Sequence, residues 1–237
     1  MKCSATGSTE IGFLVLFWPE LLPADFDERD LSHPDELANC IDGLQAEGKL
    51  IWFPDVPNGE HTVGLFVDEA PREELLNYCT LSTKIESLQV AGEGWFGGLE
   101  AIFKIDRSYL DRHPRKCSGV QVPPGEYFAE VFMTEVPDSV YEDWIQTEAG
   151  FSAQRWWWVQ TWFASLGVVA AMVCVVCLFV ATQELTLAAF AGSAILLFIA
   201  WLMSLTPGYQ RVQQARREYA AAYPKFVVHL RKEPRTK

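Results

Sequence analysis

The 237-residue sequence lacks the residue patterns on which most enzyme active sites are built. Its four histidines are isolated, with no second His or Cys at the spacing of a zinc site. It contains no G-x-S-x-G nucleophile motif. Its glycine-rich segment 91–98 has no Lys and no following helix, unlike a phosphate-binding loop. These absences predict no catalytic residue, no metal, no cofactor and no enzymatic activity.

Acidic residues are scarce in the C-terminal part of the chain. Residues 151–237 contain 3 Asp and Glu against 9 Lys and Arg, a net charge of +6, whereas residues 1–150 contain 28 against 10, a net charge of -18. Between Trp162 and Leu205 the single charged residue is Glu184. This segregation excludes a plain soluble globule, and a charge of -18 argues against a nucleic-acid partner for the N-terminal part.

Two apolar runs, 163–181 and 185–205, are each long enough to cross a bilayer as a helix, which needs about 20 residues. Only three polar residues separate them, so they predict a two-pass transmembrane hairpin over 151–206, with helices near 160–182 and 185–206. The lipid bilayer is therefore the first expected partner.

The flanks of this hairpin predict its orientation. Its tip has no Lys or Arg, whereas Arg155, Arg211, Arg216 and Arg217 flank its open end. The positive-inside bias then places both termini in the cytoplasm, and the membrane is the inner or plasma membrane if the source is bacterial. An aromatic belt is expected at the same interface. Its members are Trp156, Trp157, Trp158, Trp162, Trp201 and Tyr209.

Small residues recur at four-residue spacing in both apolar runs and allow helices to approach closely. The pairs are Gly167 and Ala171, Ala188 and Gly192, and Ala189 and Ser193. They favour an anchor packed on itself. A homo-oligomer is the alternative, and a conducting pore is less favoured because no ionisable residue lies inside either run.

Residues 1–150 predict an acidic α+β domain. Segments rich in Val, Ile, Phe and Trp predict strands, and Pro with early acidic residues predicts helix starts. The expected strands are 11–18, 50–53, 61–67, 84–91, 98–105, 119–122 and 127–134, and the expected helices are 34–44, 71–79 and 138–147.

An internal repeat relates two parts of this domain. The segment that begins V-P-N-G-E-H at Val56 aligns without gaps on V-P-P-G-E-Y at Val122, with seven identities in 25 positions. Each copy has the pattern of a turn, a strand, a turn and a helix. The alignment favours a duplication with halves near 10–80 and 83–148, and a recurrent strand-turn-helix order is the alternative.

A duplicated domain would offer a cleft between its halves for a protein or small-molecule ligand. The candidate ligand residues are Trp95, in the glycine-rich loop, Glu100, on one face of the expected strand 98–105, and Tyr127, in the second repeat. The alternatives are that Trp95 caps a sheet edge and that Glu100 lies on a solvated face.

The basic tail 207–237 predicts a helix over 207–223 and a strand over 225–232. We expect this strand to dock on the acidic domain as an edge strand. The alternative is a tail that lies on anionic lipid.

The sequence therefore favours a membrane-anchored cytoplasmic binding or sensing module. One alternative is a membrane effector or toxin-immunity protein whose hairpin oligomerises. A second alternative is a membrane-bound hydrolase that uses scattered carboxylates.

Overall fold

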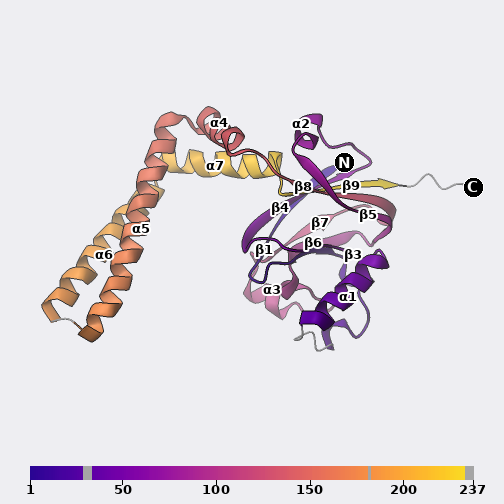
Figure 1. The fold of residues 1–237 in the computed structure, drawn as a ribbon, viewed down its shortest axis with the longest axis horizontal. Coiled ribbons are helices and arrows are strands. Elements are labelled where there is room, and N and C mark those ends of the chain that lie inside the picture. Colours follow the sequence, from indigo (N-terminus) through magenta and orange to yellow (C-terminus); the bar gives the residue numbers. More distant parts are fainter. Residues whose placement is uncertain (29–33, 181–182, 233–237) are drawn as a thin grey trace, which may run out of the picture. The chain divides into compact units, whose positions relative to one another are not determined.

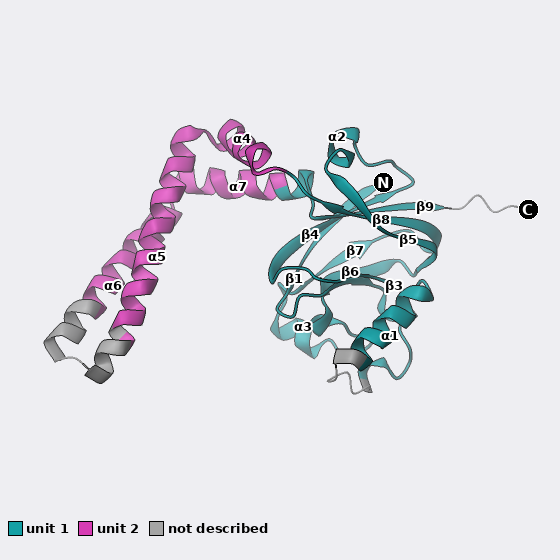
Figure 2. Cartoon of the chain, viewed as in Figure 1, with its two compact units in different colours: residues 1–136, 220–237 teal, residues 137–219 magenta. Residues whose placement is uncertain are grey.

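The structure, a computed structural model, describes residues 1–28, 34–180 and 183–232 (Figure 1). It divides into two compact units (Figure 2). Unit 1 comprises Met1–Val136 and Ala220–Lys237, and unit 2 comprises Pro137–Tyr219. Helices and two sheets confirm a mixed α+β protein.

The described elements follow the chain in a regular order. The strands are β1 (Lys2–Thr9), β2 (Leu14–Phe17), β3 (Leu50–Phe53), β4 (Gly59–Val67), β5 (Cys79–Val90), β6 (Glu93–Gly98), β7 (Cys117–Gln121), β8 (Gly125–Thr134) and β9 (Phe226–Lys232). The α-helices are α1 (Pro34–Ala46), α2 (Glu73–Leu76), α3 (Ser108–Arg112), α4 (Asp138–Ala149), α5 (Phe151–Val180), α6 (Gln183–Ser204) and α7 (Pro207–Ala222). Short 3-10 turns are η1 (Pro19–Leu21), η2 (Phe26–Glu28) and η3 (Leu99–Ala101).

Strand β9 lies in the middle of a five-stranded sheet with the order β1-β4-β9-β8-β5. It pairs in parallel with β4 and antiparallel with β8. The prediction that it docks on the domain is confirmed, and the prediction that it forms an edge strand is wrong. The reason lies in its two apolar faces: Val228 is buried between the sheets, and Val227 is buried on the opposite face. A strand buried on both faces belongs inside a sheet.

The second sheet has the order β3-β2-β6-β7, and the two sheets enclose the main core of unit 1. The outer face of this four-stranded sheet is covered by α1, η3 and α3, with Phe17 and Leu50 packed on Ile41 and Leu44 of α1 (Figure 1). Helix α2 packs on the outer face of the five-stranded sheet through Leu75.

Two local predictions are wrong, and one strand was not predicted. The expected strand 98–105 is replaced by β6, which ends at Gly98, and by η3, because its partner β2 begins at Leu14, opposite Gly98. The expected helix 71–79 is only α2, because Cys79 already begins β5. Strand β1 was not predicted, since it contains no Val, Ile or aromatic residue.

The strand order has an internal two-fold relation. If β1, β2, β3 and β4 exchange places with β5, β6, β7 and β8, respectively, each sheet order becomes its own reverse. Strand β9 lies at the centre of the five-stranded sheet. Gly59 and Gly125, which are 66 residues apart, both begin strands with positive φ, at 134° and 155°. Val56 and Val122, also 66 apart, are both buried in the core between the sheets.

Unit 2 contains a helical hairpin, α5 and α6, which begins at Phe151 rather than near residue 160. The Ser193 hydroxyl donates a hydrogen bond to the Gly167 carbonyl at 3.0 Å. A Cβ at Gly167 would lie 2.8 Å from Leu197 Cδ2, so glycine permits this close approach. The expected polar tip, 182–184, lies partly outside the described residues.

By length and composition, Phe151–Val173 can cross a membrane, with a mean hydropathy of 1.2 and 6% of its 18-residue apolar window buried in the protein. Phe190–Ser204 qualifies only when it is counted together with Pro207–Ala222, from which it is bent by 69°. Within unit 2, α7 packs against α4 through Ile145, Val212 and Ala215.

Candidate functional site

The structure places Trp95 in β6, half-buried on the outer face of the four-stranded sheet. The Arg107 guanidinium lies 4.7 Å from the centre of the Trp95 ring. The Phe103 ring packs on Trp95 at a centroid distance of 5.6 Å. Trp95 is therefore partly covered by residues of its own unit.

Glu100 lies in η3, rather than on the face of a strand. Its carboxylate accepts hydrogen bonds from the Glu10 N–H at 3.0 Å and from the Thr9 hydroxyl at 3.4 Å. A side chain at Gly98 would collide with this carboxylate, so the glycine leaves room for it. Glu100 thus ties the end of β1 to the turn that follows β6.

Tyr127 is fully buried in β8, and its hydroxyl donates a hydrogen bond to the Pro123 carbonyl at 2.8 Å. Because Tyr127 belongs to the five-stranded sheet and Trp95 lies on the outer face of the other sheet, the structure does not bring these two side chains together. The three predicted ligand residues do not share one surface.

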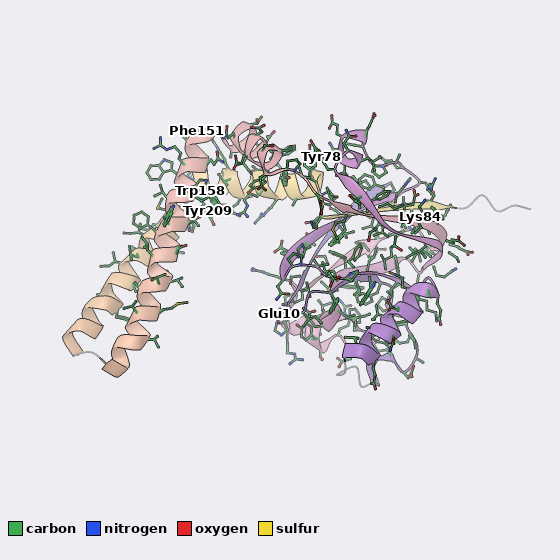
Figure 3. All side chains as sticks on the ribbon, viewed as in Figure 1. Glu10, Tyr78, Lys84, Phe151, Trp158 and Tyr209 are labelled. Atoms are coloured by element: carbon green, nitrogen blue, oxygen red, sulfur yellow. The ribbon has the colours of Figure 1, made fainter. Side chains whose placement is uncertain are left out.

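The predicted aromatic belt lies at the open end of the hairpin in unit 2, where Figure 3 labels Trp158 and Tyr209. Four of its members, Trp156, Trp158, Trp162 and Trp201, are 54–65% exposed. Trp157 is half-buried, with the Arg216 guanidinium 5.1 Å from the centre of its ring. Tyr209 is also half-buried.

A groove of about 360 Å³ opens beside this belt on the first turns of α5. Phe151, Trp156 and Val159 give it an apolar surface, and Arg155 adds a positive charge. Apolar rings next to a cation suit the boundary between lipid chains and headgroups.

Unit 1 contains two hollows that correspond under the exchange of its two halves, each between a helix end of one half and a strand of the other. The first, the acidic hollow, has a volume of about 550 Å³ and lies between the end of α1 and β5. It is lined by Asp42, Gln45, Ala46, Glu47, Thr83, Lys84, Ile85, Glu86 and Ser87. The Lys84 ammonium lies 3.3 Å from the Glu130 carboxylate.

The second, the basic hollow, has a volume of about 270 Å³ and lies between the end of α3 and β1. It is lined by Ser8, Arg112, His113, Pro114, Arg115 and Lys116. Glu10, labelled in Figure 3, holds the Lys116 ammonium at 2.6 Å. This contact lowers the pKa of Glu10 and raises the pKa of Lys116, so both groups stay charged at neutral pH.

The two hollows correspond because each lies beside a seam, which is a backbone hydrogen bond between the end of a strand and the segment that follows a helix. The Ser8 N–H, one residue before the end of β1, donates to the Lys116 carbonyl at 3.1 Å. The Gln89 N–H, one residue before the end of β5, donates to the Gly48 carbonyl at 2.7 Å. The two halves thus share this backbone contact but carry opposite charges beside it.

The sequence prediction missed the basic hollow, although a signal was present. Of the ten Lys and Arg in residues 1–150, five lie within 104–116.

Next to the hollow, burial and the Glu100 charge raise the pKa of Cys117 to about 12, which keeps this thiol protonated. Among the described residues, no group of three or more His, Cys, Asp or Glu could hold a metal ion.

No protein-family model matches the chain, and no curated protein matches it. A solved structure described as crocagin biosynthetic gene J is similar to 56% of this chain, over 75% of its own length, with 16% identity and a TM-score of 0.36. At this TM-score, function has to be argued from the geometry of the chain.

Proposed function

We propose that the protein is a non-enzymatic binding module, anchored in a membrane by α5 and α6, which recognises its ligand through unit 1 in the cytoplasm. The observation that carries this proposal is the place of β9. The chain leaves the five-stranded sheet after Thr134, forms the hairpin, and returns at Phe226 to the position beside β8. The hairpin is an insertion in the binding domain, and the domain is incomplete until the hairpin has been made.

Exposed apolar side chains support the membrane role of the hairpin. Leu166, Val169, Met172, Phe190 and Ile195 are all at least half exposed within the protein, although burial of such side chains is strongly favourable. A bilayer would cover them, and the belt at the open end would lie at its cytoplasmic surface. The Arg residues of the flanks then face the cytoplasm, as does unit 1.

The two-fold relation of the strands supports a duplication as the origin of unit 1. Both halves supply one outer and one inner strand to each sheet, and the correspondences at an offset of 66 fall at equivalent turns. After a duplication, equivalent surfaces can acquire different ligands. The acidic and basic hollows fit this origin, because they occupy equivalent places with opposite charge.

The oligomerising effector stays the second candidate, and Gly192 favours it. Gly192 is exposed on α6, and a Cβ built on it meets no described atom within 4 Å. Another helix could pack closely there. The protein can bind a ligand through unit 1 and also associate through its hairpin. The proposed membrane anchor therefore holds whether or not the protein oligomerises.

Epitope tags at the two termini and within the hairpin tip test the topology in sealed cells. We expect an impermeant antibody to reach the tip tag from outside, and to reach both terminal tags only after permeabilisation. Terminal tags on opposite sides, or a protein released from membranes by alkaline carbonate, would contradict the proposal. Purification from the native membrane, followed by mass spectrometry of co-eluting molecules, then identifies the ligand.

A further inference from the structure

The basic hollow concentrates positive charge in a domain that is otherwise strongly acidic. Three of its six lining residues are Arg or Lys, a fourth is His113, and none is Asp or Glu. Its counterpart, the acidic hollow, has Asp42, Glu47 and Glu86 among its lining residues. The fold alone therefore does not dictate the charge at this seam, and the basic side chains at one of the two equivalent places need a separate explanation.

Several donors of the basic hollow are held in place by contacts with neighbouring residues. The Arg112 Nε donates to the Ser108 carbonyl at 3.0 Å, which orients the guanidinium. The His113 ring packs on Tyr109 at a centroid distance of 4.7 Å. The ion pair with Glu10 fixes Lys116. Donors that are already ordered lose less conformational entropy when a ligand binds.

The donor set fits a compact anion with several oxygens. Guanidinium groups present paired N–H donors that match phosphate oxygens, and the Ser8 hydroxyl can donate a further hydrogen bond. Glu10 offsets the charge of Lys116 and Asp106 partly offsets that of Arg112, so Arg115 leaves excess positive charge in the hollow. Because the hollow is concave and small, it suits a single phosphate or diphosphate group better than an extended polyanion.

We propose that the basic hollow binds the phosphate or diphosphate group of a small ligand. This inference rests on the proposed binding function of unit 1 and gives its ligand a chemical class. The same group could belong to a soluble phosphorylated molecule or to the headgroup of an anionic lipid. Both sources use the same donors, and they can be separated by experiment.

The test uses the full chain in nanodiscs of neutral phosphatidylcholine, with inorganic pyrophosphate as the probe in isothermal titration calorimetry. We expect saturable binding that the double variant Arg112→Gln/Arg115→Gln weakens at least tenfold. The matched control is Lys49→Gln/Lys84→Gln, which removes the same charge at the other seam and leaves the affinity within twofold. If Arg112→Gln prevents folding, Arg115→Gln alone replaces the double variant, and a threefold or greater loss is expected.

A second arm replaces part of the phosphatidylcholine by phosphatidic acid and follows amide hydrogen exchange of residues 108–117. Slower exchange there, lost in the double variant and absent with pyrophosphate, would identify a lipid headgroup as the source. Pyrophosphate binding in neutral nanodiscs would identify a soluble ligand. Equal losses in the double variant and in the control, or no saturable effect in either arm, would overturn the proposal.

These outcomes can be told apart from failure of the proposed function. Pyrophosphate reaches the basic hollow from solution, so a wrong anchor topology would appear in the tag experiment and leave pyrophosphate binding intact. Conversely, a native ligand that binds unit 1 elsewhere, with no effect of Arg112→Gln/Arg115→Gln, would keep the binding module and remove this site.

Discussion

The backbone N–H of Thr134 donates a hydrogen bond to the carbonyl of Lys225 at 2.9 Å, although 91 residues separate the two in the chain. The Lys225 ammonium in turn donates to the Thr134 carbonyl at 3.4 Å. These contacts join the point at which the chain leaves the five-stranded sheet to the point at which it returns. Folding of unit 1 therefore requires a segment that follows the whole hairpin.

Strand β9 should be essential for the stability of unit 1. Val228→Asp places a charge between the two sheets, and we expect it to lower the free energy of unfolding by about 3 kcal/mol or more. Ile105→Asp is the control, because Ile105 is 78% exposed. Chemical denaturation of the detergent-solubilised protein measures both free energies of unfolding.

In the unmodified protein, trypsin should spare the sites at Lys225 and Arg231. Rapid loss of the tail from an intact domain would contradict the docked strand.

Close packing of α5 on α6 should depend on Gly167. Gly167→Leu forces a side chain against Leu197 and should lower the free energy of unfolding of the solubilised protein by about 2 kcal/mol. Gly192→Leu meets open space and should have little effect. In the double variant Gly167→Leu/Leu197→Ala, the smaller side chain at 197 should restore part of the stability lost in Gly167→Leu. No recovery in the double variant would show that the helices do not meet at these residues.

The stability of unit 1 should fall in mild acid because of His229 in β9. Burial and the nearby Arg231 charge lower the pKa of His229 below 6.5, although Glu130 opposes this shift. The unfolded chain then binds a proton before the folded chain does, so the free energy of unfolding decreases as the pH falls below about 6.5. In urea titrations between pH 7 and pH 5, His229→Gln should show a smaller decrease than the unmodified protein. An equal decrease would assign the acid sensitivity to other groups.

The thiol of Cys117 should be inert in the folded protein. With a pKa of about 12, only about one molecule in ten thousand carries the thiolate at pH 8, and the side chain is also buried. Mass spectrometry after iodoacetamide treatment at pH 8 should find Cys117 unmodified in the native state and modified in urea. Since unfolding restores an ordinary pKa, the free energy of unfolding contributed by this thiol is lost as the pH rises from 9 towards 12.

The elements that the sequence predicts best are those set by a single local pattern. Segment 50–53, the helix from Pro34 and the helix from Asp138 follow from apolar runs and helix-start residues. The segment 98–105 misled the prediction because Leu99, Ala101 and Phe103 are all buried, yet a 3-10 turn and an extended segment produce this alternation. Local periodicity does not show where the partner strand ends.

The sequence does not predict where an element lies when its position depends on partners far away in the chain. The apolar segment around Val227 and Val228 signalled a strand, but its central position depends on β4 and β8, which lie far away in the sequence. For the candidate site, the sequence predicts Tyr127 of the second repeat as a ligand residue, whereas the way the sheets stack buries it. The cluster of bases near Arg112 and Arg115 was visible in the sequence, but its concave shape required the seam with β1.

Strands β8 and β9 pair directly, so the hairpin is an insertion between them. The direct test is a shortened chain in which residues 135–224 are replaced by an Asn-Gly turn, because Met133 already faces Phe226 in an antiparallel pair. The measurement is the distribution of the two chains between membrane pellet and supernatant, with urea unfolding of the soluble fraction. We predict that the full chain sediments with the membrane, and that the shortened chain stays in the supernatant and unfolds cooperatively. A full chain in the supernatant, or a shortened chain without a cooperative transition, would contradict the account.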